Sequence, residues 1–414
     1  MKTSESALRE ILKPAVIVGA LGYFVDIYDL ILFSIVRRSS LTELGFSGDE
    51  LLNHGIFLLN LQMAGMLVGG IIFGILGDRL GRVVLLFSSI LLYSVANIAN
   101  GFVHSLEAYA VWRFIAGVGL AGELGGGITL VTEVLSKEAR GYGTMIVATV
   151  GVFGAVVGGL VADWFHWRTA YFVGGGLGLL LLIARLSVAE SGMFNQLKKS
   201  SQDVSRGNFL MLFNNGKRFL KYLRCILIGL PTWFVVGVLV TLSPEFAKAL
   251  HVNGTVNAAH AVAFAYLGIT FGGFGSGYLS QYLRSRKKIV LAFMLFTLLC
   301  MAAYFLAHGC SDGTFYLIIL LMGFGVGYWA VFVTIAAEQF GTNIRATVAT
   351  TVPNFIRGSL VPITWAFSQL HQGVGLGIIS SAAIVGAICF LIAIWALSGL
   401  EETHGKDLDY IEPV

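Results

Sequence analysis

The feature that most restricts the fold of this chain is the alternation of long apolar runs with short polar connections. Each run is long enough to cross the hydrocarbon core of a bilayer as a helix, which takes about 20 mostly apolar residues. We place these runs near residues 15–36, 54–76, 83–102, 107–133, 141–162, 169–189, 223–247, 258–280, 289–307, 315–338, 346–370 and 375–398. The pattern predicts an all-α membrane protein with twelve transmembrane helices.

The composition supports a membrane protein. Of the 414 residues, 56% are hydrophobic and only 12% are charged, whereas a soluble protein carries about twice that charged fraction. The four cysteines are scattered without metal-ligand spacing, and we interpret them as small packing residues. The chain contains no nucleotide-binding motif. We therefore expect neither an enzyme nor a protein that holds a metal or an organic cofactor.

The basic residues fall mainly on one side of the predicted spans. Of the 27 lysines and arginines, four lie on one face (Arg37, Arg38, Arg168 and Lys248) and two inside spans (Arg113 and Arg357), so 21 lie on the other face. Cytoplasmic loops carry the excess of basic residues in membrane proteins. The sequence thus predicts a multi-pass inner-membrane protein with both termini in the cytoplasm. The net charge of +4 reflects this topology and does not indicate nucleic-acid binding.

The chain divides into two halves that repeat each other weakly. The longest polar stretch, 190–222, separates six spans from six, which predicts an N-terminal bundle (1–189), a cytoplasmic linker (190–222) and a C-terminal bundle with its tail (223–414). Glu133 and Arg140 follow the fourth span. Glu338 and Arg345 follow the tenth, and each lies 205 residues after its counterpart. Repeated halves around a central site are typical of secondary transporters.

A short polar stretch, 74–82, lies between two apolar runs and predicts a tight, water-facing connection. It contains Gly74, Gly77, Asp78, Arg79, Gly81 and Arg82. Glycine allows a sharp backbone path, and Asp78 can bind an arginine through charge-assisted hydrogen bonds. The loop 277–288 lies where a second copy is expected, but Gln281 stands where Asp78 would align. We therefore expect a stricter latch in the first half.

These motifs resemble the major facilitator superfamily of secondary transporters. The resemblance is carried by the G-x-x-x-D-R-x-G-R pattern at 74–82, by Arg113-Phe-Ile-Ala-Gly117-Val-Gly119, by the glycines between Gly151 and Gly159, and by Trp167-Arg168 and Ala189-Glu190-Ser191. Together they are similar to the metabolite:proton and phosphate:proton symporter branches. The resemblance implies gating loops at Gly74, Asp78, Arg79, Gly81 and Arg82, at Glu133 and Arg140, and at Glu338 and Arg345.

Charged residues inside the spans are the strongest candidates for a functional site, because such charges are costly in a bilayer and usually face a cavity. Asp26 and Asp29 lie three residues apart in the first span and share a face. Arg113 and Glu123 lie on one stripe of the fourth span. We expect Asp26, or Glu123, to bind and release a proton, and Arg113 to pair with an acid near Glu123 or with Asp26. The alternative is that these charges only brace the packing of helices.

Arg357 lies near the middle of the eleventh span, with Asn354 one turn earlier. The planar guanidinium of arginine suits a carboxylate or a phosphate, so Arg357 is predicted to bind an anionic group of the substrate. The alternative is that it neutralises Asp26 or Asp29 across the two halves. Aromatic residues that can line the same cavity, or can serve only in packing, are Tyr28, Trp233, Tyr328, Trp329 and Trp365.

The sequence therefore predicts a proton-coupled importer of a small organic anion, which functions as a monomer by alternating access. Its partners are the small-molecule substrate, protons and the lipid bilayer, and the proton gradient is its energy source. Alternatives are a carrier of a cation, a zwitterion, a sugar or a metal chelate, an exporter, and a receptor that does not transport.

Overall fold

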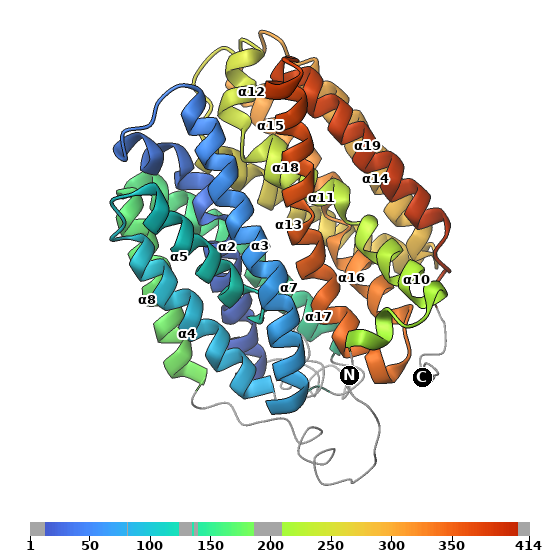
Figure 1. The fold of residues 1–414 in the computed structure, drawn as a ribbon. Coiled ribbons are helices and arrows are strands. Elements are labelled where there is room, and N and C mark those ends of the chain that lie inside the picture. Colours follow the sequence, from blue (N-terminus) through green and yellow to red (C-terminus); the bar gives the residue numbers. More distant parts are fainter. Residues whose placement is uncertain (1–12, 81, 124–134, 136–139, 186–208, 405–414) are drawn as a thin grey trace, which may run out of the picture.

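The computed structural model describes residues 13–80, 82–123, 135, 140–185 and 209–404, and its regular elements there are helices (Figure 1). Eight of the described helical segments are long and apolar enough to cross a membrane, and two shorter apolar helices accompany them. The first half contains α2 (Pro14–Glu43), α3 (Asp49–Leu80), α4 (Arg82–Asn100), α5 (Leu106–Leu120), α7 (Arg140–Trp164) and α8 (Trp167–Arg185). Each of them matches one of the first six predicted spans.

The second half is more segmented, because three of its predicted spans are interrupted. Its elements are η1 (Phe209–Leu212), α10 (Gly216–Leu227), α11 (Leu230–Phe234), η2 (Val235–Val240), α12 (Ser243–Ala249), α13 (Ala258–Tyr282), α14 (Arg286–Phe305), α15 (Asp312–Val326), α16 (Trp329–Glu338), α17 (Thr342–Gly358), α18 (Leu360–Ser368), η3 (Gln369–Gly373) and α19 (Ile378–Ser398). The helix α10 begins within the stretch predicted as linker. Residues 186–208 of that stretch lie outside the described part of the chain.

Each half packs mainly against itself, and the halves meet along a seam. Within the first half α2 packs against α7, α3 against α5 and α4 against α8, and within the second α13 and α14 pack against α15. The seam is formed chiefly by α3 with α17 and by α7 and α2 with α13. Figure 1 shows that α2 begins and α19 ends at the same end of the bundle, with α12 at the other. We call these the terminal end and the opposite end.

Glycines set the closest helix crossings. The Cα of Gly117 on α5 lies against the backbone carbonyl of Gln62 on α3, and Gly323 on α15 lies in the same way against Ala265 on α13. A side chain at either glycine would collide with backbone. Small residues permit such close approach between membrane helices. Gly277 differs from these two glycines, because a Cβ there would meet no described atom within 4 Å.

The two halves also share a helix interruption at equivalent positions. The helix α5 ends at Leu120, and α15 ends at Val326 before α16 begins at Trp329. Hydroxyl groups satisfy the backbone at both places, since Ser89 donates to the carbonyl of Gly119 at 2.6 Å and Ser276 donates to that of Gly327 at 3.2 Å. Non-helical backbone at membrane depth requires such partners. The interruptions thus extend the internal repeat from sequence to structure.

The predicted tight turn at 74–82 is mostly helix. The helix α3 continues to Leu80 and α4 begins at Arg82, so the connection between them is shorter than the predicted stretch 74–82. The stretch contains no proline, and isolated glycines are tolerated within membrane helices. Gly74 lies at the seam, where an added Cβ would be 3.8 Å from the Cγ2 methyl group of Thr351 on α17. The motif therefore belongs to the end of a seam helix.

Candidate functional site

A buried pair of opposite charges crosses the seam between the halves. Asp26 on α2 and Arg357 on α17 lie 3.7 Å apart between Oδ2 and Nη2, and both side chains are almost fully buried. At this distance the two charged groups form an ion pair, but they are too far apart for a hydrogen bond. Within the described residues, neither carboxylate oxygen of Asp26 accepts a hydrogen bond, and Nε and Nη1 of Arg357 donate none. The pair therefore retains unused hydrogen-bonding capacity.

The position of Arg357 is set by the way α17 attaches to the first half. One turn before it, Asn354 donates through Nδ2 to the carbonyl of Ala121 at 2.9 Å, where the helix α5 has just ended. One residue after it, Gly358 lies against the side chain of Leu67 on α3. These two contacts fix α17 to the first half on both sides of Arg357. Asn354, predicted as a site residue, thus joins the halves beside the ion pair.

The two acids of α2 have different surroundings. Asp26 faces the second half, whereas a carboxylate oxygen of Asp29 lies against Gly174 of α8, inside the first half. Asn97 of α4 is a further neighbour of Asp29. Residues three apart on a helix differ in direction by about 60°, which is enough to separate the two carboxylates. The two carboxylates therefore have different contacts, although Asp26 remains an electrostatic neighbour of Asp29.

Arg113 has no acidic partner at ion-pair distance in the described residues, contrary to the prediction. Its guanidinium donates to the side-chain oxygen of Gln62 and to the hydroxyl of Tyr171 at 3.4 Å, and it lies 4.8 Å from the ring centre of Phe33. Ten residues separate Arg113 from Glu123, which corresponds to about 15 Å along a helix. Arg113 therefore contacts neutral groups directly, has the carboxylate of Asp29 as an electrostatic neighbour, and lies at a different depth from Glu123.

Glu123 pairs with Arg185, the last residue of α8. Both side chains are buried, and Nη1 of Arg185 lies 3.3 Å from Oε2 of Glu123, with a second, shorter contact between Nη2 and Oε1. The pair covers Gly22 of α2, where any side chain would collide with it. The sequence assigned Arg185 to the cytoplasmic surface. The signal that was missed is that an acid buried in the fourth span requires a cation, and Arg185 ends an apolar run.

The five aromatic residues that can line a cavity lie on several elements of both halves. The hydroxyl of Tyr28 donates to the carbonyl of Ala170 within the first half. The hydroxyl of Tyr328 donates to the carbonyl of Ile228 at the interruption before α11. Both distances are 2.9 Å. These two tyrosines therefore brace the backbone.

The three tryptophans differ in exposure. Trp233 is buried, Trp329 is partly buried with its ring 5.3 Å from that of Phe332, and Trp365 is 64% exposed. Arg357 and Asp26 are electrostatic neighbours of Tyr23 and Tyr266, which the sequence did not single out. Trp365 therefore does not share the buried environment of the ion pair.

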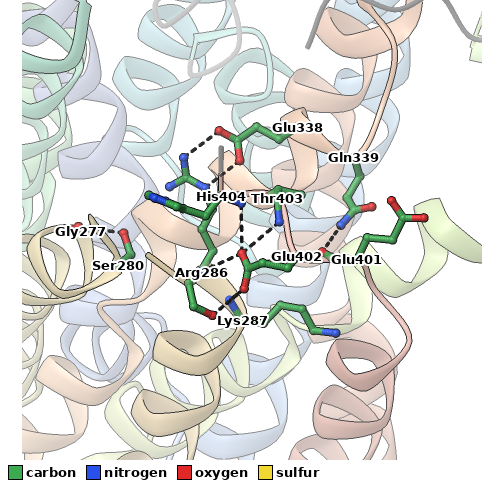
Figure 2. Close-up of polar contacts among 11 residues, drawn as sticks. Gly277, Ser280, Arg286, Lys287, Glu338, Gln339, Glu401, Glu402, Thr403 and His404 are labelled. Atoms are coloured by element: carbon green, nitrogen blue, oxygen red, sulfur yellow. Dashed lines mark hydrogen bonds and ion pairs between the residues drawn. The ribbon is translucent and has the colours of Figure 1, made fainter. Parts of the chain in front are cut away.

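At the terminal end, the predicted gating residue Glu338 binds Arg286. Two contacts join them, from Nε of Arg286 to Oε2 at 2.7 Å and from Nη2 to Oε1 at 2.8 Å. Figure 2 shows this pair beside the segment that follows α19. The sequence expected Glu338 to act with Arg345. Gly81 and Glu133, and the side chains of Asp78, Arg79, Arg82, Arg140 and Arg345, lie outside what the structure describes.

The segment after α19 is held to the start of α14 by Glu402. Its carboxylate accepts hydrogen bonds from Ser285 at 2.5 Å and from the amide of Arg286 at 3.0 Å (Figure 2). Burial raises the pKa of the Glu402 carboxyl, but hydrogen bonds from Ser285 and from the amides of Arg286, His404 and Lys287 outweigh burial and lower the pKa to about 2. A carboxylate at a helix N-terminus is also favoured by the helix dipole.

At the opposite end, a second ion pair crosses the seam, and the sequence did not predict it. Arg37 of α2 is buried and donates through Nη2 to Oε1 of Glu245 on α12 at 2.6 Å. Beside it, Thr241 donates to Ser34 at 3.0 Å. We call Arg37 and Glu245 the opposite-end latch. An arginine directly after an apolar run was counted as an exposed topological signal, although α2 continues to Glu43 and carries it into the seam.

Comparison with known proteins identifies the family. The family model described as "Major Facilitator Superfamily" matches residues 19–360. The "Niacin transporter NiaP" of Acinetobacter baylyi is 24% identical, over 95% of this chain and 95% of that protein. The "Cis,cis-muconate transport protein" of the same organism is 26% identical, over 92% of each chain.

The fold is also found among solved structures. The inward open conformation of the xylose transporter XylE from Escherichia coli superposes with a TM-score of 0.71 at 17% identity, over 95% of this chain and 97% of that one. The prediction of a transporter rather than an enzyme is confirmed by the family and by these relatives. The chain is a multi-pass, all-α membrane protein, and it belongs to the Major Facilitator Superfamily.

Proposed function

We propose that this transporter takes up a small organic anion of the carboxylate type together with protons, by alternating access. In this proposal it acts as a monomer in the inner membrane with both termini in the cytoplasm, and the proton gradient drives it without a cofactor. The names of two relatives support the substrate class, because niacin and muconate are carboxylates.

The observation that carries the proposal is the buried pair of Asp26 and Arg357. One half supplies the acid and the other the base, and both have hydrogen-bonding capacity that no described protein group uses. Arginine binds a carboxylate most strongly through two parallel hydrogen bonds. A substrate carboxylate can therefore replace Asp26 at Arg357 and make better contacts than the 3.7 Å ion pair.

Displacement of Asp26 links the anion to a proton. A buried carboxylate is stabilised in its charged form by an adjacent cation, and it favours the protonated form when that cation is engaged elsewhere. When the substrate takes Arg357, Asp26 accepts a proton. When the substrate leaves, Arg357 returns to Asp26 and the proton is released. Substrate and proton thus enter and leave together.

Alternating access requires the seam to open at one end at a time. In this structure the opposite-end latch joins α2 to α12 on the side of the central pair that faces the opposite end. Movement of the halves about the central pair would break this latch and admit substrate from that end. The topology predicted from the basic residues makes that end the outer one.

The test is uptake by reconstituted protein in vesicles with an imposed pH gradient. Nicotinate and cis,cis-muconate should accumulate, whereas neutral nicotinamide and D-xylose should not. Arg357→Gln should lower the apparent affinity for either anion by about tenfold or more, because one charged hydrogen-bonding partner contributes about 1.5–3 kcal/mol.

Arg284→Gln, at an exposed loop arginine, is the matched control and should behave as wild type. Equal uptake of nicotinate and nicotinamide, or unchanged anion affinity in Arg357→Gln, would show that the substrate is not selected as an anion.

A further inference from the structure

A cavity with a mixed polar and apolar lining lies at the opposite end of the seam, away from the central pair. Its volume is about 760 Å³, within the range of sites that bind small molecules. Both halves form it, through the end of α2, Ala162 of α7, the helix α12, the segment from His251 to Asn257 and the first residues of α13. The cavity therefore changes shape whenever the halves move.

The described residues that line this cavity include bases but no acid. Arg38 enters from the first half, and Lys248 and His251 enter from the second. The sequence places only four lysines and arginines on this face of the protein, and two of them line the cavity. Lys248 is exposed and forms no ion pair with any described residue. Positive charge is thus concentrated at one point of a face that otherwise has little.

The acids near the cavity are already engaged. Glu245 is bound by Arg37 at 2.6 Å and lies farther from Arg38, at 3.5 Å. Asp163 accepts a hydrogen bond from Asn257 at 3.2 Å and lies 3.3 Å from His260. Asp312, behind Gly254, accepts from the amide of Gly313. An entering anion therefore meets Arg38 and Lys248 directly, whereas these three carboxylates are not part of the cavity lining.

We propose that this cavity is a recruitment site that binds an organic monocarboxylate before the seam opens. The choice of a monocarboxylate rests on the proposed function, and the location rests on the cavity and its bases. The ligand carboxylate lies between Arg38 and Lys248, next to the opposite-end latch. By drawing Arg38 from Glu245, it weakens one of the two cationic contacts that hold Glu245 at the seam.

The test measures the local potential and ligand binding without requiring transport. Thr255, an exposed residue of the cavity lining, is replaced by cysteine in a Cys310→Ser background, and the protein is placed in nanodiscs. The rates of modification by an anionic and a cationic methanethiosulfonate reagent are compared. Replacing Arg38 and Lys248 together by glutamine should lower the anionic-to-cationic rate ratio about tenfold, since charged clefts concentrate counter-ions by at least that factor.

Nicotinate is the ligand probe and nicotinamide its neutral control. Nicotinate should slow the modification of Thr255→Cys, nicotinamide should not, and the double glutamine variant should abolish the protection. Lys217→Gln, at an exposed lysine of the terminal end, should change neither quantity. An unchanged rate ratio in the double variant, or absent nicotinate protection, would overturn the recruitment site. Neither readout depends on pH-driven uptake. Failure of the recruitment site can therefore be distinguished from failure of the proposed function, which the uptake experiment tests.

Discussion

At the scale of single residues, buried charges govern this molecule, and their partners come from distant parts of the chain. Asp26 pairs with Arg357, Glu123 with Arg185 and Arg37 with Glu245. Charge at membrane depth is costly, so Asp26, Glu123 and Arg357 could be predicted as functional candidates from the sequence. The partner of each charged residue could not be predicted, because it depends on which helices pack against each other. Arg185 and Arg37 therefore resembled surface residues until the helices were placed.

Loss of one member of the Glu123–Arg185 pair should be strongly destabilising. Glu123→Gln leaves the buried guanidinium without its counter-charge, for which the expected cost is about 3–5 kcal/mol. The double variant Glu123→Leu/Arg185→Met should recover most of that stability, since it removes both charges. Unfolding in detergent, followed by intrinsic fluorescence, measures both. A Glu123→Gln protein as stable as wild type would show that this pair does not stabilise the first half.

Glu402 predicts a pH dependence at the terminal end. Its folded-state pKa of about 2 lies below the ordinary value of 4.5, so its stabilising effect is complete above about pH 4.5 and is lost as the pH falls toward 2. Glu402→Gln should therefore lower the melting temperature at pH 7 and have little effect near pH 2. The side chain is largely exposed, so the loss should be about 1 kcal/mol or less. An equal loss at both pH values would contradict this account.

At the scale of elements, the apolar runs predicted the helices well, and the interruptions poorly. Hydrophobic length identifies a span, but it carries no information on where the backbone leaves the helix. The prolines gave a partial signal, since Pro231 and Pro362 each lie in the first turn of a new segment, α11 and α18. The break after Leu120 has no proline. It is stabilised by Ser89 and Asn354, residues from two other helices.

The glycine crossings give an element-scale prediction. Gly117→Leu should destabilise the packing of α3 against α5 by about 1–3 kcal/mol, the usual cost of forcing extra volume into a close contact. Gly176→Ala is the matched control, because a methyl group there meets no described atom within 4 Å. Thermal unfolding in detergent checks both variants. If Gly117→Leu had the same melting temperature as Gly176→Ala, the close contact between α3 and α5 would not contribute to stability.

At the scale of the whole molecule, the structure is joined across the seam at the opposite end. The contacts are the Arg37–Glu245 latch, the bond between Thr241 and Ser34, and the approach of His260 to Asp163. The sequence indicated two repeated halves and the end that carries the termini. It could not indicate which end is joined, because one sequence serves every state of a transporter and the states differ only in packing across the seam.

Breaking the opposite-end latch should shift the population toward opening at that end. Spin labels at Asn53 and Gln372, residues that hydrogen-bond across the seam, should show an added longer distance in Glu245→Gln by pulsed electron resonance. The charge exchange Arg37→Glu/Glu245→Arg should restore the shorter distance. Identical distance distributions in all three proteins would mean that the latch does not control opening.

In the proposed mechanism, Asp26 couples proton and anion through its exchange with Arg357. The most direct measurement compares two modes of transport in vesicles containing Asp26→Asn, with Asp49→Asn at an exposed position as the control. Exchange of internal for external nicotinate without a pH gradient needs no net proton movement and should persist. Accumulation driven by the gradient should fall to background. Gradient-driven accumulation at the wild-type level in Asp26→Asn would contradict this role of Asp26.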